Sequence, residues 1–110
     1  MKMQKVFFGF CALLAVSLIA ASVYAQKGSE KSGEALFASN CKVCHPDGGN
    51  IVNPAKTLHK KDREANKVMT AADIVHIMRN PGPGMTKFDE KTIPDRDAHK
   101  IAEYILKNLK

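Results

Sequence analysis

The chain has 110 residues, of which 45% are hydrophobic and 25% charged, and it contains no tryptophan. This length suits one small domain and excludes a large multidomain protein. The formal net charge of +6 comes without an Arg-rich tract or interleaved aromatic residues, so we do not expect a nucleic-acid partner.

Residues 1–25 have the pattern of a cleavable signal peptide. Two lysines near the start precede an almost unbroken apolar run over residues 6–20. Val23-Tyr24-Ala25 then offers small residues at the two positions that a signal peptidase reads, with cleavage expected after Ala25. A retained membrane anchor is the alternative, but the apolar run is short for a span of about 20 residues. We therefore predict export to the periplasm and a mature domain of residues 26–110 without stable membrane insertion. Loss of the two lysines would lower the formal charge from +6 to +4.

The first predicted helix of the mature chain begins after Ser32, a residue type that often caps helix N-termini. Glu34 falls in the first turn, where the helix dipole favours a carboxylate. The helix runs toward Asn40, and Phe37 and Cys41 lie four residues apart, on one face. This helix is therefore expected to bring an aromatic ring and a thiol to the same place.

The sequence Cys41-Lys42-Val43-Cys44-His45 follows, and it is the C-x-x-C-H signature of covalent c-type haem attachment. Each thiol adds to one vinyl group of the porphyrin, and His45 supplies an axial nitrogen to the iron. The alternatives are a zinc half-site, which needs two more ligands at short spacing, a thioredoxin-like pair between a strand and a helix, and a disulfide. Export agrees with the attachment of haem c outside the inner membrane, and a tethered haem would supply core that so short a chain lacks.

Residues 46–50, with the sequence PDGGN, predict a tight turn, and an extended or loop segment follows over residues 51–54. The carbonyl of Pro54 is predicted to accept the Nδ1 proton of His45, as partners of metal-bound histidines do. Leu58 is predicted to pack on the porphyrin. Three nearby lysines are expected to form a solvated basic surface: Lys56, Lys60 and Lys61.

The sequence from Thr70 to Asp73 is a capping box, which predicts the start of another helix. Three apolar residues then follow at the i, i+3, i+4 spacing of one helix face: Ile74, Ile77 and Met78. This helix must end near Asn80, because Pro81 and two glycines follow.

Residues 80–86, with the sequence NPGPGMT, can form neither a helix nor a central strand. A methionine in such a loop is explained if the loop lies over a haem face and Met85 gives its sulfur to the iron. The alternative is that Met85 fills a gap in the core. The other residues that could supply the sixth ligand are His59, His76, His99, Met69 and Met78.

The last predicted helix runs from Pro94 to Lys107, with acidic residues in its first turn and basic residues at its end. Its apolar residues form one stripe: Ala98, Ile101, Tyr104, Ile105 and Leu109. Tyr104 is expected to pack against Phe37, so that the first and last helices of the domain cross.

With these residues the chain resembles the monohaem class I c-type cytochromes, in particular the small soluble cytochromes of the c-six type and related bacterial proteins. The residues that carry the resemblance are Gly33, Phe37, the motif 41–45, Gly48-Gly49-Asn50, Pro54, Lys56-Thr57-Leu58, Asn80-Pro81-Gly82, Met85 and Tyr104-Ile105-Leu106. The resemblance implies an all-α fold with crossed terminal helices around one covalently bound haem c. It implies that Cys41 and Cys44 link the haem and that His45 and Met85 are its axial ligands, although Thr86 stands where the family often has proline.

The function implied is one-electron transfer between respiratory or photosynthetic redox partners, with no catalysis on a substrate. A monomer is expected, and the basic surface suits partners with acidic docking patches; Lys42 and Lys87 are candidates for this contact. Two alternatives remain open: a small haem enzyme or gas sensor with a labile sixth ligand, and an assembly or regulatory protein in which haem is structural.

Overall fold

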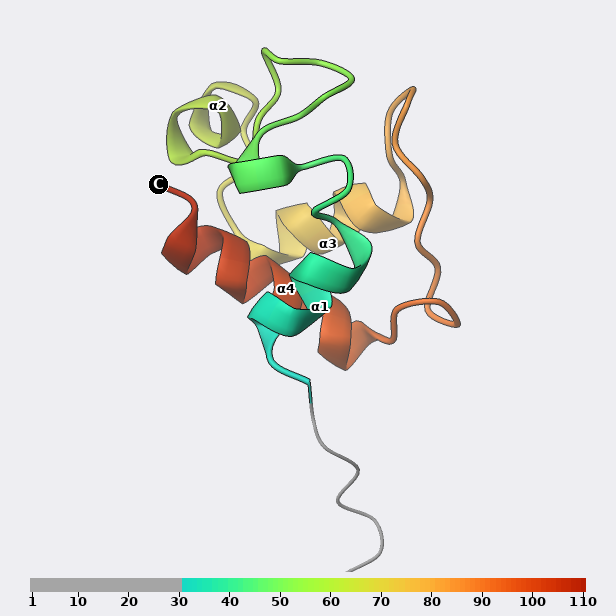
Figure 1. The fold of residues 1–110 in the computed structure, drawn as a ribbon. Helices are drawn as coiled ribbons and strands as arrows, with labels where there is room; N and C mark the ends of the chain where they lie inside the picture. The colour runs from blue at the N-terminus through green and yellow to red at the C-terminus, as the bar shows by residue number, and fades with distance from the viewer. Residues whose placement is uncertain (1–30) are drawn as a thin grey trace, which may run out of the picture. The chain divides into compact units, whose positions relative to one another are not determined.

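The computed structural model describes residues 31–110, which contain four α-helices, one short 3₁₀ helix and no β-strand (Figure 1). In chain order these elements are α1 (Gly33–Asn40), η2 (Pro46–Gly48), α2 (Lys60–Ala65), α3 (Ala71–Arg79) and α4 (Asp95–Asn108). The predicted all-α fold is confirmed for this part of the chain. The predicted signal peptide and its cleavage site lie outside the described residues. Among residues 31–110, none of the helices has both the length and the apolar character of a membrane span.

Helix α1 begins as predicted, because the side chain of Ser32 accepts a hydrogen bond from the backbone N–H of Ala35 at 3.1 Å. The helix buries Leu36 and Phe37. It ends at Asn40, and the N–H of Cys41 still donates to the carbonyl of Phe37 at 2.8 Å. The first cysteine of the motif is thus held at the end of a capped helix.

Helix α3 starts with the complete capping box that the sequence predicts. Thr70 accepts from the N–H of Asp73 at 3.1 Å, and the Asp73 carboxylate accepts from the N–H groups of Met69 and Thr70, each at 3.0 Å. These bonds to the ionised form lower the pKa of Asp73. The helix ends at Arg79, ahead of Pro81, also as predicted.

Helix α4 packs against both α1 and α3 and is the centre of the domain (Figure 1). It begins at Asp95, with Pro94 as its N-cap, and extends to Asn108, so the predicted ends were each wrong by one residue. Ala98, Ile101 and Ala102 are fully buried. The whole buried apolar core consists of Leu36, Phe37, Ile74, Met78, Ile93, Ala98, Ile101, Ala102 and Ile105.

Helix α2 has no counterpart in the sequence-based prediction. Its six residues, KKDREA, carry no apolar stripe, and such a short helix gives little periodic signal. Lys60 and Lys61 are exposed on it, in agreement with the predicted basic surface. Arg63 is instead buried, with only 6% of its surface exposed.

Candidate haem-attachment site

The motif residues follow α1 in a compact turn. The N–H groups of Cys44 and His45 both donate to the carbonyl of Cys41, at 3.2 and 2.9 Å. Both thiols are half-buried and free, not joined in a disulfide. The turn therefore presents two thiols and an imidazole from five consecutive residues.

Burial raises the pKa of the Cys41 thiol from its ordinary value of 9.0 to about 11, because it disfavours the charged thiolate. A thioredoxin-like pair works in the opposite way, with a lowered pKa that creates a thiolate nucleophile. The electrostatics at Cys41 therefore argue against a thioredoxin-like redox pair.

His45 is held in the tautomer that a metal ligand needs. Its Nδ1 lies 2.7 Å from the carbonyl oxygen of Gly49. Because a carbonyl can only accept, Nδ1 carries the proton, and Nε2 of the neutral ring keeps its lone pair for a metal. Such a bond also fixes the ring orientation and makes the ligand nitrogen more basic.

The prediction that Pro54 supplies this acceptor is wrong in the structure. Pro54 lies exposed in a turn nine residues beyond His45. Gly49 is only four residues away, and η2 folds the chain back so that its carbonyl faces the ring. The glycine pair in PDGGN predicts a turn, but nothing in that pattern shows which carbonyl will face the imidazole.

Gly48 makes this return of the chain possible. Its φ angle is +79°, in the region that favours glycine. A Cβ at this position would lie 3.1 Å from Cδ2 of Leu109 and 3.2 Å from Cε1 of His59, both tight contacts. The turn after His45 is thus closely covered by His59, which precedes α2, and by Leu109, which follows α4.

The loop of residues 80–86 carries Met85 half-buried against the core. Gly84, with φ of +87°, lies so close to Val52 that a Cβ on it would be 2.7 Å from Cγ1. The neighbour of Val52, Ile51, donates its N–H to the carbonyl of Cys44 at 3.1 Å. Through these contacts the structure connects the Met85 loop with the cysteine motif.

Leu58 is half-buried against the core, and its N–H donates to the carbonyl of Gly48 at 2.7 Å. It therefore lies next to the turn that orients His45. The position agrees with a side chain that contacts a bound porphyrin.

The rival ligands of the sequence-based prediction have other surroundings. Nδ1 of His59 donates to the carbonyl of Lys110 at 3.1 Å, and Nδ1 of His99 to that of Asp95 at 2.9 Å. His76 is exposed on α3. Met69 is 60% exposed, whereas Met78 is 97% buried in the apolar core, which is the usual role of methionine.

Several large apolar side chains around the motif are exposed: Val43 (80%), Ile51 (63%) and Val52 (57%). Neighbouring exposed apolar groups of this size commonly mark a surface that another molecule covers. Together with two free thiols, an imidazole with a free Nε2 and the half-buried thioether of Met85, they fit a covalently bound haem. Among residues 31–110 no group of three or more His, Cys, Asp or Glu side chains could hold a separate metal ion.

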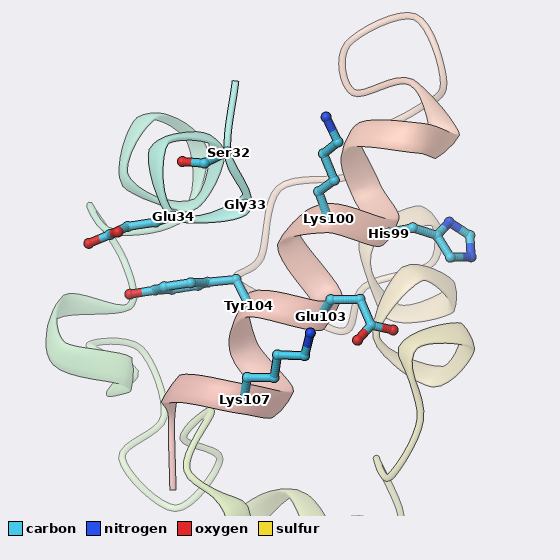
Figure 2. A pocket seen from close by; sticks show the side chains of 8 residues that line it. All are labelled: Ser32, Gly33, Glu34, His99, Lys100, Glu103, Tyr104 and Lys107. Atoms are coloured by element: carbon cyan, nitrogen blue, oxygen red, sulfur yellow. The ribbon is translucent and has the colours of Figure 1, made fainter. Parts of the chain in front are cut away.

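A shallow groove lies elsewhere, between the start of α1 and one side of α4 (Figure 2). It is lined by Ser32, Gly33, Glu34, His99, Lys100, Glu103, Tyr104 and Lys107. None of these residues belongs to the cysteine motif or to the Met85 loop. The groove therefore forms no part of the candidate site.

Comparison with known proteins agrees with this site. The family described as "Cytochrome C oxidase, cbb3-type, subunit III" matches residues 28–105. Cytochrome c6 of Synechocystis is 34% identical over 106 residues, which cover 94% of this chain and 88% of the relative. The outer membrane cytochrome OmcF of Geobacter sulfurreducens is 49% identical, with a TM-score of 0.70 over 72% of this chain and all of that chain. Cytochrome c6C from Synechococcus, 23% identical with a TM-score of 0.67, shares the fold.

The all-α fold and the C-x-x-C-H site define a protein with one covalently bound haem c. The chain belongs to the c-type cytochrome family. It is a monohaem class I cytochrome that resembles cytochrome c6. Like these relatives, it is a small haem electron carrier.

Proposed function

We propose that this protein is a periplasmic one-electron carrier whose haem iron is ligated by His45 and Met85. The observation that carries the proposal is the tautomer of His45, with Nδ1 bonded to Gly49 and Nε2 free beside two free thiols. When bound, the haem supplies an iron that accepts and releases one electron. The residues around it hold that iron in place and exclude water.

Cys41 and Cys44 are the proposed attachment points, and each contributes one thioether bond. Met85 would supply a sulfur ligand to this iron; its loop passes beside Val52, and the neighbouring Ile51 donates its N–H to the carbonyl of Cys44. A His/Met pair raises the reduction potential relative to two histidines. Leu58 packs on the porphyrin in this proposal, and Pro54 only stiffens the loop.

The proposed partners are redox proteins with acidic docking surfaces. This chain would bind them as a monomer. Lys42 and Lys87 are both exposed, one within the haem motif and the other two residues after Met85. Charges at such positions speed the encounter of partners but are screened by salt. Electron-transfer rates with the native partner should therefore fall as the ionic strength rises, and rates independent of salt would contradict this part of the proposal.

The ligand set is tested by a redox titration of the holoprotein and by optical spectra of Met85→Ala. We expect wild-type ferric protein to show the weak long-wavelength sulfur-to-iron band. The variant should keep its covalent haem, lose this band, and have a lower potential and an open site for carbon monoxide. Met69→Ala is the matched control, because Met69 is 60% exposed and its variant should keep the band.

Ready carbon monoxide or cyanide binding by the wild-type protein, with no sulfur-to-iron band, would overturn His/Met ligation. That outcome would favour a haem enzyme or sensor with a labile sixth ligand. A wild-type band that survives in Met85→Ala would assign the sulfur to another methionine.

A further inference from the structure

The buried residue that haem attachment does not explain is Arg63 on α2. It is only 6% exposed, and its guanidinium donates through Nε to the carbonyl of Leu58 at 2.7 Å and through Nη2 to that of Leu109 at 3.2 Å. Within residues 31–110 it forms no ion pair. A buried cation is costly unless its hydrogen bonds are made, so an apolar residue would be the simpler choice for packing alone.

The two residues whose carbonyls Arg63 binds, Leu58 and Leu109, both contact the turn that follows the cysteine motif. The N–H of Leu58, the residue whose carbonyl Arg63 binds, donates to the carbonyl of Gly48 at 2.7 Å. Gly48 in turn donates its N–H to the carbonyl of His45 at 3.1 Å. The next carbonyl, that of Gly49, accepts the Nδ1 proton of His45.

The second carbonyl, that of Leu109, approaches the same turn from the end of α4. The side chain of Leu109 covers Gly48, where even a Cβ would come within 3.1 Å of it. His59 also donates to the backbone oxygen of Lys110, and its Cε1 would lie 3.2 Å from a Cβ at Gly48. Arg63 thus ties three segments together around one turn: residues 46–49, 58–63 and 109–110.

We propose that Arg63 is a positioning residue for the axial ligand His45, acting through Leu58 and Gly48. This inference rests on the proposed function, in which His45 ligates the haem iron. By fixing the Leu58 and Leu109 carbonyls, the guanidinium holds the turn in the position at which Gly49 faces Nδ1. A short Nδ1–H bond makes the imidazole a stronger donor to iron, which stabilises the ferric state and lowers the potential.

Two variants separate this role from a simple charge effect. Arg63→Lys keeps the positive charge but loses the planar fork that reaches two carbonyls at once. Arg63→Met removes both the charge and the hydrogen bonds. If Arg63 acts only as a buried charge, Arg63→Lys keeps the wild-type potential and Arg63→Met lowers it, since loss of a nearby cation favours ferric iron.

If Arg63 positions the turn, Arg63→Lys raises the midpoint potential, because the Nδ1–H bond to Gly49 is weakened while the charge is retained. NMR spectra of the ferrous holoprotein should also show a shifted Nδ1 proton of His45. Hydrogen exchange at the Leu58 amide should become roughly tenfold faster, beyond any change shared by the core amides. Arg63→Met should show the same two NMR changes.

The matched control is Arg79→Met. Arg79 also donates to a backbone carbonyl, that of Phe88 at 2.9 Å, and to the carboxylate of Asp95 at 2.7 Å. Phe88 lies in the loop after α3 and Asp95 at the start of α4, so neither belongs to the segments that Arg63 joins. Its variant should leave the His45 proton and the Leu58 amide unchanged. If Arg63→Met yields no folded holoprotein, Arg63→Lys decides by itself.

An unchanged potential, His45 signal and Leu58 exchange in Arg63→Lys would overturn the inference and leave the proposed function intact. The proposed function fails separately, if the wild-type ferrous protein lacks the signals of an iron-bound His45.

Discussion

The rings of Phe37 and Tyr104 lie with their centroids 5.3 Å apart and their planes inclined by 43°. This contact joins α1 to α4, where the first and last helices of the described domain cross (Figure 1). Tilted aromatic pairs at this distance are favourable beyond the area that they bury. Because the motif begins directly after α1, the contact also holds Cys41 against the core.

We expect Phe37→Ala to destabilise the holoprotein by about 3–5 kcal/mol, because it removes a buried ring and leaves a cavity. Tyr104→Phe keeps the ring and should change the free energy of unfolding by less than about 0.5 kcal/mol. Denaturant unfolding followed by helical circular dichroism measures both. Equal effects of the two variants would mean that the ring contact is not what holds the crossing.

The same crossing requires a glycine. A Cβ at Gly33 would lie 2.3 Å from the backbone oxygen of Lys100 and 3.1 Å from Cβ of Tyr104. Gly33→Ala should therefore push α1 away from α4 and destabilise the protein by about 1–3 kcal/mol or more, despite the better helix propensity of alanine. Gly82→Ala is the control, because nothing lies within 4 Å of its Cβ position. A Gly33→Ala protein as stable as Gly82→Ala would show that the helices do not approach this closely.

Gly84→Ala should disturb the proposed ligand loop, since the new methyl group would lie 2.7 Å from Cγ1 of Val52 and its φ angle of +87° disfavours alanine. We expect a weaker sulfur-to-iron band in the ferric spectrum. Val52→Ala alone should have little effect, because Val52 is 57% exposed. The double variant should recover part of the band, and a double variant no better than Gly84→Ala would leave backbone strain as the only cause.

The raised pKa of Cys41 predicts a pH dependence that haem attachment abolishes. In the haem-free chain the protonated thiol is favoured in the folded state, so its stabilising effect is complete below pH 9 and is lost as the pH rises through about 11. The helical signal of the haem-free chain should therefore fall over this range. Haem-free Cys41→Ser and the holoprotein, neither of which has this thiol, should lack the decline. If the helical signal of haem-free Cys41→Ser declined over the same pH range, the decline would have to come from a titratable group other than the Cys41 thiol.

Features under the control of short-range physical chemistry could be predicted from the order of the residues alone. The caps at Ser32 and Thr70 satisfy N–H groups within one helical turn, and the prolines around residue 82 prevent any helix there. The spacing of Cys41, Cys44 and His45 follows from the size of the porphyrin and needs no knowledge of the fold. The apolar stripe of α4 was likewise sufficient to predict its contact with α1.

Features that depend on contacts between residues distant in the sequence could not be predicted in this way. Helix α2 has no apolar stripe that would predict it. The burial of Arg63 on this helix depends on the carbonyls of Leu58 and Leu109, which accept hydrogen bonds from its guanidinium. The acceptor for His45 was misassigned to Pro54 because the choice among nearby carbonyls depends on how the chain returns at Gly48. Backbone carbonyls are the same in every residue, so which of them faces an imidazole is set by the path of the chain and the packing around it.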